Sequence, residues 1–183
     1  MVYIFLADGF ETIEALTVVD MLRRAGIGIQ TVSMQADTTV TSAHKIAVQA
    51  DVMLSDVTEQ EAEMYVLPGG IPGTPNLRSS DTLMQMLEKQ YKEGKYIAAI
   101  CAAPGIFSEL GFLKGRHAIC YPSYEEQLEQ EGAFLVREGA VVDGNVITGR
   151  GMGTAIDFAA AIITVLKDGD TADAIKKAIV YEV

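Results

Sequence analysis

Cysteine, histidine and basic residues are scarce in this sequence. It has two cysteines, two histidines and no tryptophan among 183 residues. Two thiols are too few for a disulfide framework, and His44 and His117 are too far apart to suggest a zinc motif. Lysine and arginine number 14 against 25 acidic residues, which gives a net charge of -11. Because a nucleic-acid surface needs the opposite sign, nucleic acid is not an expected partner.

Long apolar runs are also missing. The longest apolar stretch covers only residues 158–166, well short of the roughly 20 residues of a membrane span. The apolar start of the chain has no basic lead, and Asp8 interrupts it, so we expect no signal peptide. The sequence therefore predicts a soluble, cytoplasmic protein with reduced thiols and no membrane partner.

Enough apolar material is nevertheless present for a complete core. Hydrophobic residues make up 49% of the chain, which excludes a disordered or collagen-like protein. At roughly 150 residues per domain, the length predicts a single domain over residues 1–183.

Short β-branched runs alternate with helical stretches, a pattern typical of parallel strands joined by crossover helices. We expect strands at residues 2–6, 27–34, 64–67, 96–100 and 146–148, and helices at residues 11–25, 81–93, 154–167 and 171–179, with a further helix that ends at Leu110. Thr58 and Glu61 fit a capping box for another short helix. Residues 38–51 and a hairpin at 143–144 are expected to add antiparallel strands beside the sheet. The predicted fold class is a three-layer α/β sandwich with a mostly parallel sheet.

Cys101 is the most informative residue for chemistry. It follows an apolar strand and precedes a helix, and its small neighbours Ala102, Ala103 and Gly105 allow a sharp turn. Such a turn places a side chain at the carboxyl end of the sheet, where open α/β sheets bind their ligands. The helix N-terminus is expected to lower the pKa of the thiol. A buried structural cysteine is an equally good interpretation of the context alone.

Glu14 is a carboxylate on an apolar helix face. It shares that face with Val18, Met21 and Ala25 at helical spacing. A semi-buried glutamate tends to stay protonated and can donate a hydrogen bond to a nearby thiolate. The alternative is a glutamate at the rim with its carboxylate in water, which periodicity alone slightly favours.

Two glycine-rich segments follow predicted strands. In 67–70, adjacent glycines would let backbone amides approach a bound oxyanion, although a plain turn explains them equally. Residues 149–154 contain alternate glycines but lack the spacing of a nucleotide-binding loop. We interpret the second segment as a tight turn before a buried helix.

Taken together, five segments closely resemble the ThiJ/PfpI superfamily. Within it they look most like the branch of the human parkinsonism-associated protein and its bacterial relatives. The matching segments run in family order across nearly the whole chain: residues 7–14, 19–26, 67–70, 98–104 and 148–154.

The resemblance implies a flavodoxin-like sandwich, of the kind also seen in class I glutamine amidotransferases, that forms a homodimer. It implies that Cys101 is the reactive thiol at a strained turn and that Glu14 is its protonated partner. The amides of Gly70 and Ala102 would line an oxyanion position. Glu11 and Arg24 would lie at or near the dimer interface beside the pocket. No cofactor and no metal are implied.

One position departs from the family pattern. Many members carry a His-Pro pair where this chain has Tyr121 and Pro122, and tyrosine, with a pKa near 10, is a poor base at neutral pH. We hypothesise that the neighbouring Cys120 resolves an oxidised Cys101, although a buried structural role is the more frequent one. We also hypothesise that His44 reaches across a dimer to supply an imidazole.

The resemblance suggests a cysteine-dependent enzyme of the glyoxalase or deglycase type. It would act slowly on small reactive carbonyls or glycated amines, and an associated role would be in stress response. The main alternative is a non-enzymatic redox sensor that works through oxidation of Cys101. A peptidase or amidase, or a role in thiamine biosynthesis, has less support from these residues.

Overall fold

A computed structural model describes residues 1–181 and builds them around a seven-stranded sheet. The strand order is β10-β11-β7-β6-β1-β2-β5. Only β10 runs antiparallel to its neighbour among the paired strands of this sheet in the described residues. The strands are β1 (Val2–Leu6), β2 (Ile29–Ser33), β5 (Val52–Met53), β6 (Met64–Leu67), β7 (Tyr96–Ile100), β10 (Ala140–Asp143) and β11 (Val146–Gly149).

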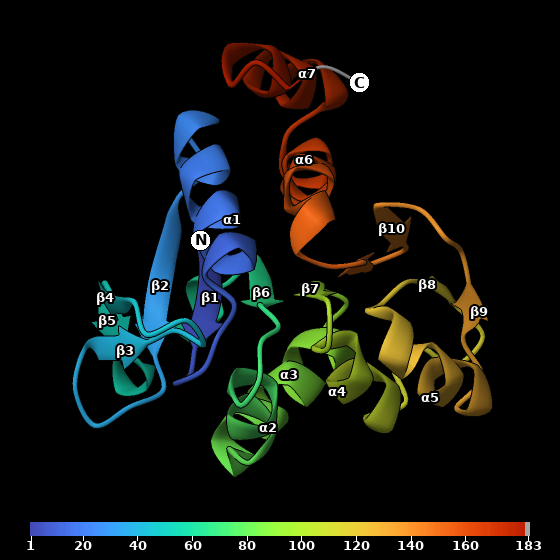
Figure 1. Cartoon of the computed structure of the whole chain (residues 1–183), viewed down its shortest axis with the longest axis horizontal. Helices are drawn as coiled ribbons and strands as arrows, with labels where there is room; N and C mark the ends of the chain where they lie inside the picture. Colours follow the sequence, from blue (N-terminus) through green and yellow to red (C-terminus); the bar gives the residue numbers. More distant parts are fainter. Residues whose placement is uncertain (182–183) are drawn as a thin grey trace.

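Helices cover both faces of the sheet (Figure 1). One layer holds α1 (Thr12–Arg24), α6 (Ala155–Leu166) and α7 (Gly169–Ala178). The opposite side holds α2 (Gly73–Arg78), α3 (Asp81–Lys92), α4 (Pro104–Glu109) and α5 (Glu125–Gln130). Short 3-10 turns lie at η1 (Leu54–Asp56), η2 (Glu59–Glu61), η3 (Pro122–Tyr124) and η4 (Met152–Thr154). The predicted three-layer α/β sandwich is confirmed.

The strand sequences explain the two cores. Along β1, Val2, Ile4 and Leu6 enter the core under α1 and α6, whereas Tyr3 and Phe5 enter the core on the other face. Every residue of β1 is buried, as expected for a parallel strand covered on both sides. The continuous apolar runs in the sequence are the direct signature of this double burial.

Residues 38–51 contain antiparallel strands, as predicted. They form a separate antiparallel hairpin of β3 (Thr39–Thr41) and β4 (Ala47–Gln49), not an extension of the central sheet. Two bonds tie this hairpin to the loop after β1: Thr41 N donates to Asp8 Oδ1 and Gly9 N donates to Thr41 O, both at 2.8 Å. The hairpin therefore belongs to the carboxyl end of the sheet.

Smaller differences occur at element ends. The segment at 58–61 is a single 3-10 turn, and Thr58 makes no side-chain cap. A small parallel pair, β8 (His117–Ala118) with β9 (Phe134–Leu135), was not predicted.

Among residues 1–181, none of the helices combines the length and the apolar character that crossing a membrane requires.

Candidate active site

Cys101 lies at a strained turn between β7 and α4. Its φ is +67°, in the left-handed region that costs a side-chain-bearing residue energy. Two backbone hydrogen bonds hold it there: Cys101 N donates to Gly149 O at 3.0 Å, and Tyr121 N donates to Cys101 O at 2.8 Å. The turn leaves the thiol partly exposed at the carboxyl end of the sheet, as in a nucleophile elbow.

Glu14 is buried in the first turn of α1, with 1% of its surface exposed. The amide of Gly69 donates to Glu14 Oε2 at 2.9 Å. The second oxygen, Oε1, is buried without a nitrogen or oxygen partner among residues 1–181. Hydrogen bonding with the Cys101 thiol affects the pKa of Glu14 and of the thiol. The interpretation of Glu14 as a solvated rim residue is therefore wrong.

Gly69 is the residue that lets Glu14 and Cys101 meet. A Cβ added at Gly69 would lie 2.7 Å from Cys101 Cβ and 2.7 Å from Glu14 Oε2. Any side chain there would push the two groups apart. The sequence pattern marked the glycine pair but gave no signal that Gly69 is the donor to Glu14, because the contact spans 55 positions in the chain.

The two acids titrate as a pair. Burial raises the pKa of Glu14 from 4.5 to about 7. Burial, and then the neighbouring Glu14 carboxylate, raise the pKa of Cys101 from 9.0 to about 12. The expectation that the helix N-terminus lowers the pKa of this thiol is wrong, because these two effects outweigh the amide of Ala102. The pair accordingly holds one shared proton between the two values.

Two backbone amides remain available beside the thiol. In residues 1–181, neither Gly70 N nor Ala102 N donates to a backbone carbonyl. The Ala102 amide does interact with the Cys101 sulfur, which it stabilises as a thiolate. Gly70 has a φ of +101°, and a Cβ there would collide with the Glu11 amide. The Gly70 amide thus has no backbone acceptor, and the Ala102 amide is directed at the reactive sulfur, next to which an oxyanion would form.

Glu11 and His44 meet at the edge of this site. Glu11 precedes α1, where its side chain accepts from Ile13 N at 3.4 Å. Its amide donates to Gly69 O at 2.8 Å. His44 Nδ1 lies 3.6 Å from Glu11 Oε2 of the same chain. The hairpin therefore brings His44 to its own chain's site edge, and a role across a dimer stays a prediction.

Arg24 is not beside its own chain's pocket. It ends α1, where its Nε pairs with Asp20 Oδ2 at 2.6 Å. At 1.5 Å per residue, the far end of α1 lies roughly 15 Å from Glu14. Within one chain Arg24 and Glu14 occupy opposite ends of one helix, so the predicted position of Arg24 beside a pocket requires a second subunit. A contribution from a partner subunit stays a prediction.

Cys120 and Tyr121 point to different places. The Cys120 side chain is fully buried in the core under α3 and α4, whereas Cys101 packs against the core under α1 and α6. Burial, and then Glu125, raise the pKa of Cys120 to about 12. Tyr121 is half exposed. The structure therefore favours a structural role for Cys120 over a resolving one.

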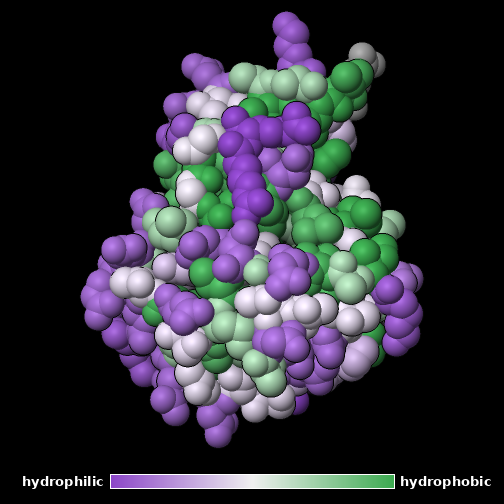
Figure 2. Space-filling model, turned by 90° about the vertical axis from the view of Figure 1, so that its left-hand side faces the viewer, coloured by the Kyte–Doolittle hydropathy of each residue, from purple (hydrophilic) through white to green (hydrophobic). Residues whose placement is uncertain are grey.

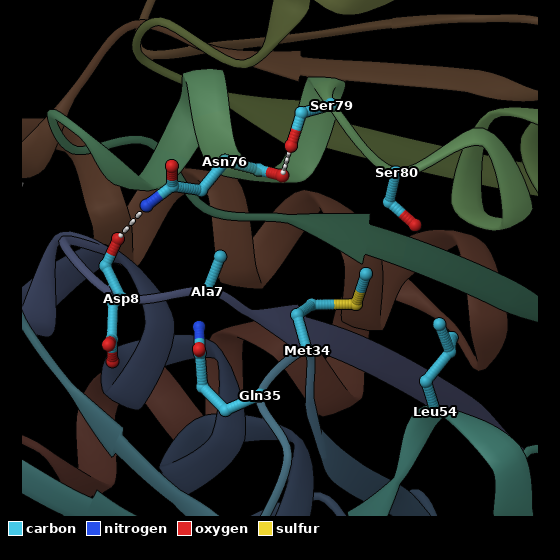
Figure 3. Close-up of a pocket in the computed structure, with 8 residues that line it drawn as sticks. All are labelled: Ala7, Asp8, Met34, Gln35, Leu54, Asn76, Ser79 and Ser80. Carbon is cyan, nitrogen blue, oxygen red and sulfur yellow. Dashed lines mark hydrogen bonds between the residues drawn. The ribbon is translucent and has the colours of Figure 1, made fainter.

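Two hollows lie near the carboxyl ends of the strands. One of about 340 Å³ is formed by residues 121–122 and 150–154, next to the Cys101 turn. The other, of about 360 Å³, is polar and includes Asp8, Gln35, Asn76 and Ser80 (Figure 3). Asn76 Nδ2 donates to Asp8 O across its edge at 2.8 Å. Cys101 and Glu14 line neither of these two, of which the first adjoins the thiol turn. A smaller hollow of about 100 Å³ adjoins the turn from the side of α4 and is lined in part by Ala102 and Gly105.

The structure gives segment 149–154 a larger role than the sequence did. Gly149 O accepts from Cys101 N, so this segment helps to fix the reactive turn. The parallel register of β7 with β11, in which Ile100 lies beside Gly149, produces this contact. No cluster of three or more His, Cys, Asp or Glu side chains suited to a metal ion occurs in residues 1–181.

The fold and this site define an α/β protein with a strained cysteine beside a buried glutamic acid. Residues 1–165 match the DJ-1/PfpI family, and the chain belongs to this family.

Similar proteins extend from plants to animals. Protein DJ-1 homolog A of Arabidopsis thaliana is 36% identical over 173 residues, which cover 94% of this chain and 44% of the plant protein. Protein dj-1beta of Drosophila melanogaster is 35% identical over 87% of this chain and 85% of its own length. The chain spans less than half the length of the two plant relatives, homologs A and B.

Solved structures show the same fold. Toxoplasma gondii DJ-1, described as oxidized, matches with a TM-score of 0.93 and 33% identity over 100% of this chain and 98% of that one. Drosophila melanogaster DJ-1beta matches with a TM-score of 0.93 and 32% identity over the same shares of the two chains. Family membership and fold thus agree along the described chain.

Proposed function

We propose that this protein is a cysteine-dependent enzyme that converts small 2-oxoaldehydes, or their adducts with amines, into hydroxy acids. One observation carries the proposal: a strained, partly exposed Cys101 shares a proton with a buried Glu14 that Gly69 holds in place. Paired acids of different pKa, close to a nucleophile, are the usual arrangement for moving protons during such a reaction.

The reaction begins when the Cys101 thiolate adds to the aldehyde carbon. A C–S bond forms, and the π electrons of the carbonyl move to its oxygen. The amides of Gly70 and Ala102 stabilise the resulting oxyanion. Glu14 then gives its proton to the oxyanion, which yields the hemithioacetal and leaves Glu14 as a carboxylate. Attack requires the form of the pair in which the shared proton has moved from the sulfur to Glu14, which leaves the sulfur negatively charged.

The second half of the reaction is an internal redox step. Glu14 takes the proton from the former aldehyde carbon, and the adjacent carbonyl carbon gains a proton through an enediol. The first carbon is thereby oxidised to a thioester and the second is reduced to an alcohol. Water hydrolyses the thioester, which releases the 2-hydroxy acid and restores the thiol. With a pKa of about 7, Glu14 can both accept and donate a proton at neutral pH.

A named relative supports this substrate class. Deglycase PYRAB04690 of Pyrococcus abyssi is 29% identical over 91% of this chain and 99% of its own length. The name deglycase describes removal of carbonyl-derived adducts. Adducts of 2-oxoaldehydes with amines are among the substrates proposed here. The half-exposed Tyr121 provides no imidazole at the site, so slow turnover is expected.

Formation of lactate from methylglyoxal tests the proposal. Cys101→Ser and Glu14→Gln should each lower kcat/KM by about 100-fold or more, because they remove the nucleophile and the proton carrier. Cys120→Ala removes the other thiol and should keep most of the activity. Lactate formation that survives in Cys101→Ser would refute the proposal.

A redox sensor is the second candidate function. The partly exposed Cys101 supports it, as does the oxidized state named for Toxoplasma gondii DJ-1. A thiolate attacks hydrogen peroxide, an S–O bond forms as the O–O bond breaks, and hydroxide leaves. The product is a sulfenic acid, which a second peroxide oxidises to sulfinic acid. Oxidation of Cys101 by peroxide without any lactate from methylglyoxal would favour the sensor.

We also propose that the protein forms a homodimer. Ile13 on α1 and Ile46 on the β3–β4 hairpin are each 49% exposed, close to the site edge. Seen from the side of β2 and β5, hydrophobic surface gathers toward the layer of α1, α6 and α7 (Figure 2). Exposed apolar side chains of this size often mark a protein interface. Sedimentation should give a dimer, and Ile13→Asp should give a monomer.

Subunit mixing tests the role of His44. If His44 acts across the dimer, a mixture of Cys101→Ser and His44→Ala subunits contains heterodimers with one intact site. Lactate formation by the mixture should then exceed the mean of the two separate variants. Equality with that mean would assign His44 to its own chain, where it meets Glu11.

A further inference from the structure

The apolar hollow beside Cys101 is built by the two segments that fix the cysteine. Gly149 O and Tyr121 N hold the two backbone groups of Cys101. The hollow of about 340 Å³ is lined by Tyr121 and Pro122 from one segment and by residues 150–154 from the other. The segments that line the hollow are therefore the ones that hold the reactive turn, and the hollow adjoins that turn.

The lining of the hollow is mostly apolar. Tyr121 and Met152 are 50% and 54% exposed, although both have large apolar side chains. Gly151 lies against the Tyr121 ring, because a Cβ there would make an ordinary contact of 3.5 Å with Tyr121 Cδ2. Contiguous exposed apolar side chains next to a reactive group are typical of a ligand subsite.

Arg150 gives the hollow a polar edge. Its side chain makes no ion pair within residues 1–181 and lines the hollow beside Met152. A guanidinium favours the face of an aromatic ring or an anionic group. The polar hollow of Figure 3 has amide and hydroxyl groups instead and is not adjacent to the cysteine. The two hollows therefore suit different ligands.

We propose that the hollow of Tyr121, Met152 and Arg150 is a specificity subsite for a ring-sized apolar substituent on the carbonyl substrate. The preferred substrates are accordingly aryl 2-oxoaldehydes and their hydroxy-acid products, more than methyl ones. This inference rests on the proposed function for its reaction but also makes a claim about binding alone. One extra methylene in an apolar pocket commonly changes the ratio of kcat/KM between two substrates by about 10-fold or more. A ring buries more apolar surface than one methylene, so its effect should be at least as large.

Binding and turnover are measured separately. Calorimetry on the Cys101→Ser protein should show that mandelate, the aryl hydroxy acid, binds at least about 10-fold more tightly than lactate. Met152→Ala in that background should remove most of the difference. With the thiol intact, the ratio of kcat/KM for phenylglyoxal to that for methylglyoxal should fall about 10-fold in Met152→Ala, compared as initial rates because both aldehydes also modify arginine.

The control is Val142→Ala. Val142 is 46% exposed on the edge strand β10 and lies outside the hollow, so both ratios should stay at their wild-type values. Equal binding of mandelate and lactate, as expected if a second copy of the chain fills the hollow, overturns the proposal. If neither aldehyde is turned over but mandelate still binds through Met152, the reaction proposed above fails while the subsite stands.

Discussion

The amide of Gly69 donates a 2.9 Å hydrogen bond to Glu14 Oε2, and the space where a side chain of Gly69 would lie is filled by Glu14 and Cys101. Gly69→Ala should therefore lower the free energy of unfolding by about 1–3 kcal/mol, because a methyl group is forced into a packed site. Urea denaturation measures the change.

Gly169→Ala is the matched control for that substitution. A Cβ at Gly169 meets nothing within 4 Å, and the residue begins α7. The free energy of unfolding of Gly169→Ala should differ from that of the wild type by no more than about 0.5 kcal/mol. Equal stability of the two alanine variants would contradict the assignment of Gly69 as the spacer of the site.

The raised pKa of Glu14 predicts a pH-dependent stability. The unfolded carboxyl ionises near 4.5, whereas the folded one stays protonated up to about 7. Because the folded state binds the extra proton, the contribution of Glu14 to stability is largest below 4.5, falls as the pH rises to about 7, and then levels off. Ionisation of Glu14 in the folded protein should lower the free energy of unfolding by about 3 kcal/mol over this pH range.

Comparison with Glu14→Gln isolates this contribution. Glutamine cannot ionise, so the difference in unfolding free energy between wild type and variant should move in favour of the variant between pH 4.5 and pH 7. Glu129→Gln, at an exposed position of α5, should keep the wild-type pH profile. A pH-independent difference for Glu14→Gln would show that the buried carboxyl does not titrate there.

Alkylation of Cys101 locates the shared proton. If the proton stays on Glu14, the sulfur becomes reactive as the pair loses its first proton, and the rate with iodoacetamide should rise with a midpoint near 7. In Glu14→Gln the buried thiol has no acidic partner, so its midpoint should lie above the usual 9.0. A wild-type midpoint near 12 would place the proton on sulfur and remove the basis for nucleophilic attack at neutral pH.

The layers of the fold could be predicted because they depend on local pattern. The apolar runs of β1 and β7 predict that these strands are buried. The helical periodicity of apolar residues in α1 likewise predicts which face of the helix is buried. The Cys101 turn was likewise signalled by Ala102 and Ala103, whose small side chains follow a buried strand. Local sequence thus determined which residues lie at the carboxyl end of the sheet.

The thiol environment could not be predicted in the same way. The pKa of Cys101 depends on Glu14, and their contact depends on Gly69, which belongs to a third segment. The distance from Arg24 to Glu14 depends on the length of α1. A resemblance between short segments gives no information about that distance. Contacts between distant segments decide these properties, and single positions carry no signal of them.

The separate burial of the two cysteines predicts the product of oxidation. Cys120 is enclosed in the core under α3 and α4, on the opposite face of the sheet from the core that Cys101 contacts. A disulfide needs Cβ atoms that point toward each other. Peroxide should therefore oxidise Cys101 to sulfenic and sulfinic acids without a Cys101–Cys120 bond, as measured by peptide mass spectrometry. A disulfide-linked peptide from the native protein would contradict this; the same oxidant on unfolded protein should produce it.

Replacing Tyr121 with histidine should increase activity. Tyr121 N donates to Cys101 O, and the Tyr121 side chain lines the hollow that adjoins the cysteine turn. A histidine there therefore brings an imidazole to the edge of the site. A base with a pKa near 6.5 suits proton transfer at neutral pH, and such a group commonly contributes about 100-fold. We expect kcat/KM for methylglyoxal to rise at least about 10-fold in Tyr121→His. The gain should disappear as the pH falls below about 6, where the imidazole is protonated. Tyr121→Phe keeps a ring without a titratable group and should show no such gain, whereas an equal gain in both variants would assign the effect to packing.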